Sequence, residues 1–169
     1  KRMSFILPLL EMKPGERVLD TGSGYSWTTE WLMKLGYEAV GVDITRSYLE
    51  IGMERMGNNR PHLILADIEN LPIKDSIFRS VLCYDSFHHI PDRERAMAHF
   101  YRVLKPGGRV VLAEPGGEHE HHPYSREVMQ KYGILEKGME LADLRAYCEG
   151  LEFESPGQHY FFKIQERKA

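Results

Sequence analysis

The chain has 169 residues, of which 42% are hydrophobic and 28% are charged, and its formal net charge at pH 7 is −3. This length suits one domain with a substantial core, so we take residues 1–169 as a single domain. The acidic balance argues against nucleic acid as a partner, and no segment is apolar enough to predict a membrane span or a signal peptide. Cys83 and Cys148 show no disulfide or metal spacing, which suits reduced thiols in the cytoplasm.

The first elements are a helix, a strand and a glycine turn. We expect a short helix over Ser4 to Leu10 that Pro8 interrupts, and a first strand over Arg17 to Asp20. The turn after this strand carries Gly22 and Gly24, and a helix follows it. Glycines at such a turn leave room for a ligand, and the first backbone N–H groups of the helix are free to face it.

Two features separate this turn from a dinucleotide-binding fingerprint. The strand ends in Asp20, whose carboxylate repels a pyrophosphate but attracts a positively charged ligand group. The third glycine of the dinucleotide pattern is also missing, and Ser26 stands in its place as a small residue that is also able to cap the helix. A strand-to-helix turn of an ordinary α/β domain remains the alternative interpretation of this stretch.

Strands and helices alternate along the rest of the chain. Capping signals mark two helix starts, Ser47 with Glu50 and later Asp92. Lys105 to Gly108 is expected to end the second of these helices and to form a turn. The further expected strands are Glu38–Asp43, His62–Ala66, Ser80–Tyr84, Arg109–Ala113, Phe153–Ser155 and Tyr160–Ile164, and the last expected helices are Ser125–Tyr132 and Leu141–Cys148.

This alternation predicts an α/β fold around a mostly parallel sheet. Ligands of such sheets bind beyond the carboxyl ends of the strands. Acidic residues stand at or just after the ends of the five expected parallel strands, namely Asp20, Asp43, Asp67, Asp85 and Glu114. We therefore expect a crevice lined with carboxylates.

The spacing of these acids indicates a nucleoside ligand. Asp43 follows the glycine turn by roughly 20 residues, the spacing at which a carboxylate reaches ribose hydroxyls. Asp67 is placed to accept a hydrogen bond from an exocyclic amine, with Ile44 and Ile68 on either side of a flat base. Asp20 then faces a cationic, amino-acid-like end of the same ligand.

Five motifs carry a family resemblance over about residues 18–114. They are Val18–Gly24, Val42–Asp43, Ala66–Ile68, Asp85–Pro91 and Leu104–Arg109. In these motifs the chain resembles the class I S-adenosylmethionine-dependent methyltransferases, in particular the small-molecule branch with the quinone C-methyltransferases.

The resemblance implies a Rossmann-like three-layer sandwich with a seven-stranded sheet whose last strand is antiparallel. It places Gly22 and Gly24 under the methionine end of S-adenosylmethionine, Asp43 on the ribose, Asp67 on the adenine amine and Tyr84 in the lining of the site. Relatives carry helices before the first strand that cover the site. This chain has little sequence there and opens Lys1-Arg2-Met3, so we expect a domain of a longer protein.

Methyl transfer needs a base only where the acceptor must lose a proton. His88 and His89 follow the fourth strand and are the candidate catalytic residues, because imidazole titrates near neutral pH. A structural role for either histidine is the alternative. The run His119-Glu120-His121-His122 matches no zinc pattern, so no metal site is expected.

The predicted function is methyl transfer from S-adenosylmethionine to a small molecule. Glu114–Gly116 and Tyr132–Glu136 resemble methyltransferase domains associated with bacterial glycan assembly, which points to a sugar or glycan precursor. A non-catalytic cofactor-binding module and an NAD(P)-dependent oxidoreductase are the alternatives. The aromatic segment His159–Phe162 is expected to form a buried strand or, if the covering helices are missing, a homodimer contact.

Overall fold

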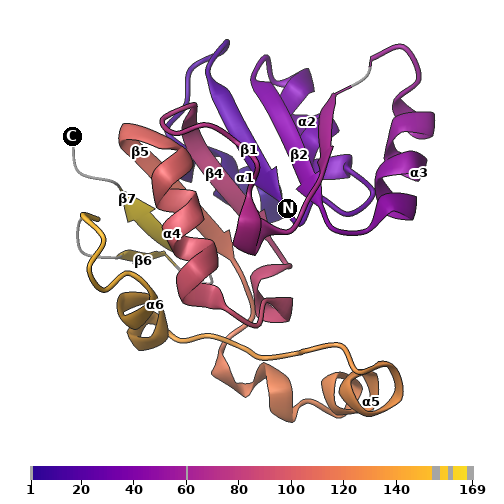
Figure 1. Ribbon diagram of the computed structural model, residues 1–169, viewed down its shortest axis with the longest axis vertical. Coiled ribbons are helices and arrows are strands. Elements are labelled where there is room, and N and C mark those ends of the chain that lie inside the picture. Colours follow the sequence, from indigo (N-terminus) through magenta and orange to yellow (C-terminus); the bar gives the residue numbers. More distant parts are fainter. Residues whose placement is uncertain (1, 60, 154–156, 160–161, 167–169) are drawn as a thin grey trace.

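A twisted sheet runs through the middle of the molecule (Figure 1), in a computed structural model that describes residues 2–59, 61–153, 157–159 and 162–166. Five strands are parallel, while β7 runs antiparallel to both β5 and β6. The predicted α/β fold with a parallel sheet is confirmed. In their order across the sheet the strands are β3 (His62–Leu65), β2 (Glu38–Asp43), β1 (Arg17–Thr21), β4 (Phe78–Tyr84), β5 (Leu104–Ala113), β7 (Phe162–Glu166) and β6 (Gly157–His159).

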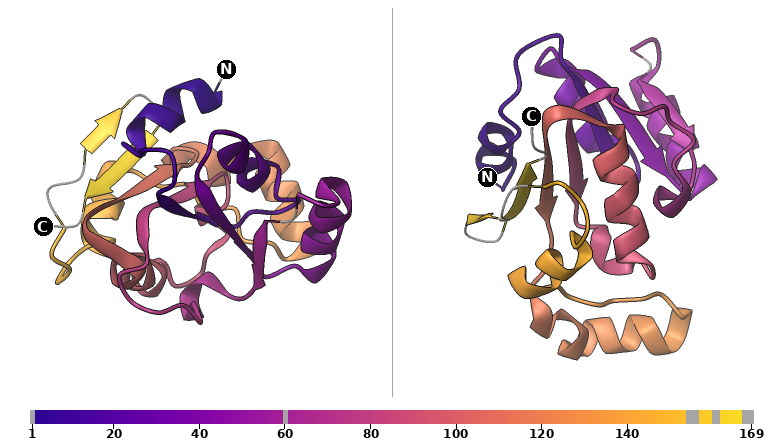
Figure 2. Two further views of the ribbon diagram at one scale, coloured as in Figure 1. Left: turned by 90° about the horizontal axis from the view of Figure 1, so that it is seen from above. Right: turned by 60° about the vertical axis from the view of Figure 1, so that its left-hand side comes forward.

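Helices cover both faces of the sheet, so that the fold has three layers. Figure 2 shows α1 (Arg2–Leu9) on one face and α4 (Arg93–Val103) on the other. On the α1 face, Ile6, Leu10 and Leu32 of α2 (Trp27–Lys34) pack on β1 and β4. The opposite face holds the larger core, around α4 and α6 (Leu141–Tyr147). Helix α3 (Arg46–Met56) contacts β2 and β3.

A long segment, residues 114–140, separates β5 from α6 and is called the excursion below. It contains the 3-10 helix η3 (Gly117–His121) and α5 (Pro123–Tyr132), and it lies beyond the carboxyl ends of the strands (Figure 2). Two further 3-10 turns, η1 (Ile68–Asn70) and η2 (Phe87–His89), follow β3 and β4 at that same edge. Across the described ranges, no helix combines the length and apolar character needed to cross a bilayer.

Several local predictions need correction. Pro8 does not interrupt α1 but lies inside its last turn. The Ser47–Glu50 capping box is wrong, because α3 begins at Arg46 with Thr45 as its N-cap. The expected turn over 105–108 belongs to β5, whose pairing with β4 shifts register between Phe78 and Ser80.

Other boundaries were predicted well. Asp92 caps α4 as expected, since its carboxylate accepts a hydrogen bond from the Arg95 N–H at 3.0 Å.

Among the late elements, β6 and β7 are displaced from the expected ranges, and residues 154–156 and 160–161 lie outside the described part of the chain.

Candidate functional site

The glycine turn after β1 is bound to the neighbouring strand. The Ser23 N–H donates to the Val42 carbonyl at 2.9 Å, and Gly22 and Gly24 have φ angles of 65° and 51°. A Cβ on Gly22 would lie 1.8 Å from the Ser86 hydroxyl oxygen, whereas a Cβ on Gly24 would meet no heavy atom of the described residues within 4 Å. Gly22 therefore allows close packing on the β4 side, and the position beside Gly24 is open.

Asp43 joins the end of β2 to this turn. Its Oδ2 accepts a hydrogen bond from the Gly24 N–H at 2.7 Å, and its Oδ1 accepts from the Thr45 N–H at 2.8 Å. Each carboxylate oxygen has a second lone pair, so the side chain is able to accept two more hydrogen bonds. The predicted grouping of Asp43 with the glycines is present.

Asp67 and Ile68 stand at the start of η1, beyond β3. The Asp67 carboxylate caps this turn by accepting from the Glu69 N–H at 2.8 Å. Ile44 is 69% exposed beyond the end of β2, as a face for a flat base requires. Ile68 differs from this, because its side chain is only 5% exposed and packs in the core with Leu19 and Val42, so it offers little face to a base.

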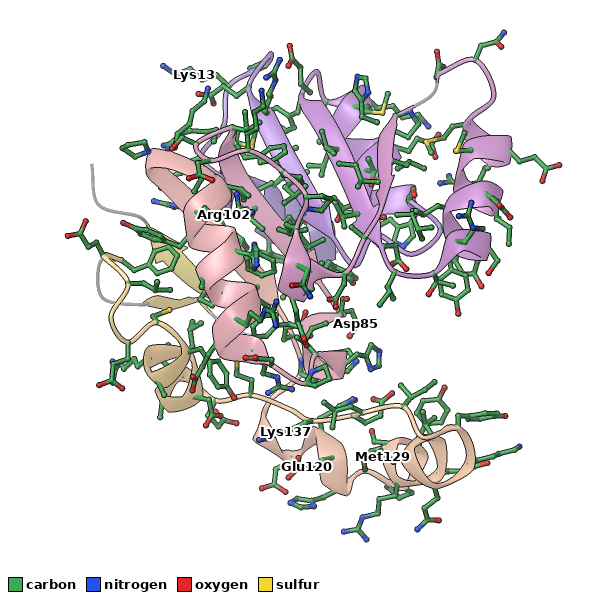
Figure 3. The ribbon with its side chains drawn as sticks, in the orientation of Figure 1. Lys13, Asp85, Arg102, Glu120, Met129 and Lys137 are labelled. Atoms are coloured by element: carbon green, nitrogen blue, oxygen red, sulfur yellow. The ribbon has the colours of Figure 1, made fainter. Side chains whose placement is uncertain are left out.

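The end of β4 contributes an aromatic wall and a strained residue. Tyr84 is half-buried and meets Trp27 edge-to-face, with 5.4 Å between ring centroids. Asp85 follows with a φ of 53°, a region that costs a non-glycine residue free energy. Figure 3 places Asp85 at the carboxyl edge, facing the excursion that carries Glu120 and Lys137, while Lys13 lies at the opposite end of the sheet.

Asp20 is almost completely buried. Its Oδ2 accepts a 2.5 Å hydrogen bond from the Thr29 hydroxyl at the start of α2. Burial raises the pKa of Asp20 from 3.8 to about 7; the nearby Asp43 carboxylate adds to this, and the Thr29 hydrogen bond opposes it. The carboxyl is thus poised to ionise when a cation approaches it.

Replacing Asp20 with asparagine is expected to remove a pH dependence of stability. The folded protein keeps a proton on Asp20 that the unfolded chain loses, so the free energy of unfolding falls between about pH 4 and pH 7 and this contribution is constant above. Asparagine keeps an acceptor for the Thr29 hydroxyl. Urea unfolding measures the free energy of unfolding of both proteins at pH 5 and pH 8. The value for the variant minus that for the wild type should be a few kcal/mol larger at pH 8 than at pH 5. An unchanged difference between the two pH values would contradict the burial of an ionisable group there.

Ser26 occupies the position of the missing third glycine in a glycine-like conformation. Its φ is 59°, and its buried hydroxyl has no hydrogen-bond partner among the residues that the structure describes. The predicted cap is absent, since the side chain makes no capping hydrogen bond to α2. A hydroxyl-bearing residue is tolerated there because it is small enough to pack against Gly52 of α3.

Ser26→Gly is therefore expected to stabilise the fold by about 1 kcal/mol, because it removes both the positive-φ strain and the unpaired hydroxyl. Chemical denaturation measures this gain. The control is Ser76→Gly, an exposed residue with a φ of 56°, which relieves strain alone and should gain less. A destabilised Ser26→Gly variant would mean that the contact with Gly52 outweighs both effects.

Glu114 is not a crevice acid, which corrects the sequence-based expectation. It is buried after β5, where its Oε1 accepts from the Ser86 and Phe87 N–H groups, both at 2.9 Å. Its Oε2 lies 2.7 Å from Nδ1 of His88. Glu114 thus holds η2 in place and orients the His88 ring.

The two candidate catalytic histidines have different surroundings. His88 is 6% exposed, whereas the His89 side chain is 39% exposed. The His89 Nδ1 lies 2.7 Å from the Leu135 carbonyl, which can only accept, so Nδ1 carries the proton and Nε2 is the basic nitrogen of the neutral ring. The ring centroids of His88 and His89 are 3.9 Å apart.

Two residues that the sequence analysis did not single out, Arg93 and Glu136, complete this region. Arg93 is buried and donates to the carbonyls of His88, Lys137 and Gly138, which holds the end of the excursion against α4. Glu136 is buried beside His88, and its Oε2 lies 2.7 Å from Nε2 of His119. A buried arginine or glutamate leaves no signal in a single sequence, because both residue types are usually exposed.

A match to a protein family shows to which family the chain belongs. The model of the methyltransferase domain family matches residues 19–112, more than half of the chain. The chain belongs to this methyltransferase family. The resemblance to class I S-adenosylmethionine-dependent methyltransferases is thus confirmed, and S-adenosylmethionine is the cofactor of the family.

Curated relatives match the same part of the chain. Methyltransferase GfsG of Streptomyces halstedii is 34% identical over 62% of this chain and 40% of its own length. The ubiquinone/menaquinone C-methyltransferase UbiE of Vibrio campbellii is 30% identical over 60% of this chain and 42% of its own. The chain thus spans about two-fifths of the length of these relatives.

Solved structures share the fold. The S-adenosylmethionine-dependent methyltransferase of Mesorhizobium loti superposes with a TM-score of 0.82 at 15% identity, covering 97% of this chain and 96% of that one. Phosphoethanolamine N-methyltransferase 2 of Haemonchus contortus, solved with S-adenosyl-L-methionine, gives a TM-score of 0.78 at 23% identity over 92% of this chain and 37% of its own. At these identities the likeness establishes the fold.

Proposed function

We propose that this domain binds S-adenosylmethionine at the carboxyl ends of β1, β2 and β3 and transfers its methyl group to a small molecule. The observation that carries the proposal is the Asp43 carboxylate, which lies at the end of β2 and is hydrogen-bonded to the Gly24 N–H. An acid with spare lone pairs thus stands beside an open glycine position, the arrangement that a ribose next to an amino-acid tail requires.

The cofactor residues take distinct roles in this proposal. Asp43 accepts from the ribose hydroxyls, Asp67 from the adenine amine, and the exposed Ile44 packs on the base. Gly22 and Gly24 lie under the methionine end, and Tyr84 lines the site. Asp20 contributes a negative charge on the same side, and ionises as the positively charged cofactor binds.

The protein contributes mainly alignment to such a transfer. The sulfonium supplies the driving force, and holding the acceptor atom, the methyl carbon and sulfur in line lowers the barrier by several kcal/mol. Where the acceptor is a hydroxyl, a base must take its proton. We assign this role to His89 ahead of His88, because the His89 ring is accessible and its Nε2 is basic.

The acceptor class rests on the relatives and on the net charge of the chain. Relatives are named for methylation of quinones and of phosphoethanolamine, both small molecules. The net charge of −3 makes nucleic acid a poor partner. We propose a hydroxylated acceptor such as a sugar or glycan precursor. A cytoplasmic location without a membrane partner, and a homodimer, stay predictions.

The test is incubation with methyl-labelled S-adenosylmethionine and separate acceptor sets: demethylated quinols, phosphoethanolamine and nucleotide sugars. Release of adenosylhomocysteine with labelled product from one set supports the proposal, and Asp43→Asn should abolish it. Glu38→Gln is the control, since Glu38 lies at the opposite end of the same strand. Cofactor binding without release in any set would favour a non-catalytic binding module.

A further inference from the structure

Three potential metal ligands converge beyond the carboxyl ends of β4 and β5. They are His88 of η2, His119 of η3 and Glu136 of the segment between α5 and α6. One ligand atom from each lies within 4.8 Å of the other two. Distant parts of the sequence supply them, and His119 is the one member of the run 119–122 that takes part.

His88 is oriented as a ligand. The Oε1 atom of Glu114 accepts hydrogen bonds from two backbone N–H groups, and its Oε2 atom lies 2.7 Å from Nδ1 of His88. Because a carboxylate can only accept, Nδ1 of His88 carries the proton and Nε2 has a free lone pair. The same Nε2 lies 3.8 Å from Oε2 of Glu136. A carboxylate behind a histidine is the arrangement that commonly supports a metal-ligating imidazole.

His119 and Glu136 close the cluster. Their Nε2 and Oε2 atoms are 2.7 Å apart, and both Glu114 and Glu136 are only 6% exposed. Two buried carboxylates thus flank the histidines. The buried Arg93 nearby directs its guanidinium to the carbonyls of His88, Lys137 and Gly138. A positive charge between the ligand atoms would offset the cost of burying the two carboxylates.

We propose that His88 Nε2, His119 Nε2 and the Glu136 carboxylate bind one divalent transition-metal ion, with Zn²⁺ as the representative. Two imidazoles and one carboxylate suit this class of ion. Bonds of about 2.0–2.2 Å in a tetrahedral site require ligand atoms roughly 3.3 Å apart, and the spacings of 2.7 and 3.8 Å lie on either side of that value. Binding displaces the proton between His119 and Glu136 into solvent.

Three protein ligands leave one coordination position open. A hydroxyl or water bound there has a lowered pKa, because the ion stabilises its anion. This use of the position by an acceptor hydroxyl rests on the proposed methyl transfer. The binding of the ion does not, because Asp43 and Gly24 are not in the cluster.

The test is calorimetric titration of the chelator-treated, tag-free chain with Zn²⁺ alone, together with the visible absorption of bound Co²⁺. Stoichiometric binding is expected in the wild type and in His121→Ala, a control on an exposed residue of the same 3-10 helix. His119→Ala and Glu136→Gln should bind at least about 100-fold more weakly. Thermal unfolding of both variants without metal shows whether they fold. If His119→Ala does not fold, His119→Asn is used in its place.

Absence of one-to-one binding to the wild type at micromolar Zn²⁺ would overturn the proposal, as would an equal loss in His121→Ala. Adenosylhomocysteine titrated into the same samples keeps the two proposals apart. If adenosylhomocysteine binds and Zn²⁺ does not, the metal site fails alone; if Zn²⁺ binds and adenosylhomocysteine does not, the proposed function fails alone.

Discussion

Asp43→Ala is expected to raise the dissociation constant for S-adenosylmethionine at least about 100-fold. The substitution removes an acceptor for two charge-assisted ribose hydrogen bonds, each worth about 1.5–3 kcal/mol, and 100-fold corresponds to about 2.7 kcal/mol. It also removes the acceptor of the hydrogen bonds that the Gly24 and Thr45 N–H groups donate. The glycine turn then loses its hydrogen bond to the end of β2.

Isothermal titration calorimetry with adenosylhomocysteine measures this loss directly. Glu38→Ala is the matched control, because Glu38 is an acid at the amino end of the same strand and pairs with Arg17 at the surface. The control should bind as the wild type does. An Asp43→Ala variant that is folded and binds within threefold of the wild type would show that the ribose lies elsewhere.

Arg93→Met is expected to lower the free energy of unfolding by about 3 kcal/mol and to loosen the excursion between β5 and α6. The guanidinium is buried and donates to three carbonyls, of His88, Lys137 and Gly138, which methionine leaves without a donor. Those carbonyls join η2 and the end of the excursion to α4, so the loss should be felt at both places.

Urea denaturation measures the stability, and limited proteolysis followed by mass spectrometry locates any new cleavage within residues 115–139. Arg95→Met is the control, since Arg95 lies on the same helix but is exposed, and its guanidinium donates to the Asn70 side chain at the surface. Equal effects of the two substitutions, or cleavage sites spread over the whole chain, would contradict an anchoring role for Arg93.

The part of the fold that the sequence predicts best is the part with local signals. The bounds of β2 are predicted to the residue, because the short apolar run Ala39–Val42 lies between two acids, Glu38 and Asp43. The start of α3 was not. The Asp43 carboxylate accepts the Thr45 N–H, so the chain turns into the helix directly after β2, and the Ser-x-x-Glu pattern falls inside it.

The same distinction holds for the candidate site. Asp43 and Gly24 were predicted together because an acid at a strand end and a glycine turn are both visible in the sequence, and they meet at 2.7 Å. The direction of Ile68 was not visible, because the Asp67 cap that starts η1 turns that side chain into the core. The partnership of His88 with Glu136 depends on a fold-back of nearly fifty residues.

We infer that the strand-end acids bind a nucleoside with a cationic amino-acid tail in place of a pyrophosphate. Parallel calorimetric titrations of the chain with adenosylhomocysteine and with NAD⁺ test it most directly. We expect one-to-one binding of adenosylhomocysteine and no measurable heat with NAD⁺. Tight binding of NAD⁺ with none of adenosylhomocysteine would contradict it.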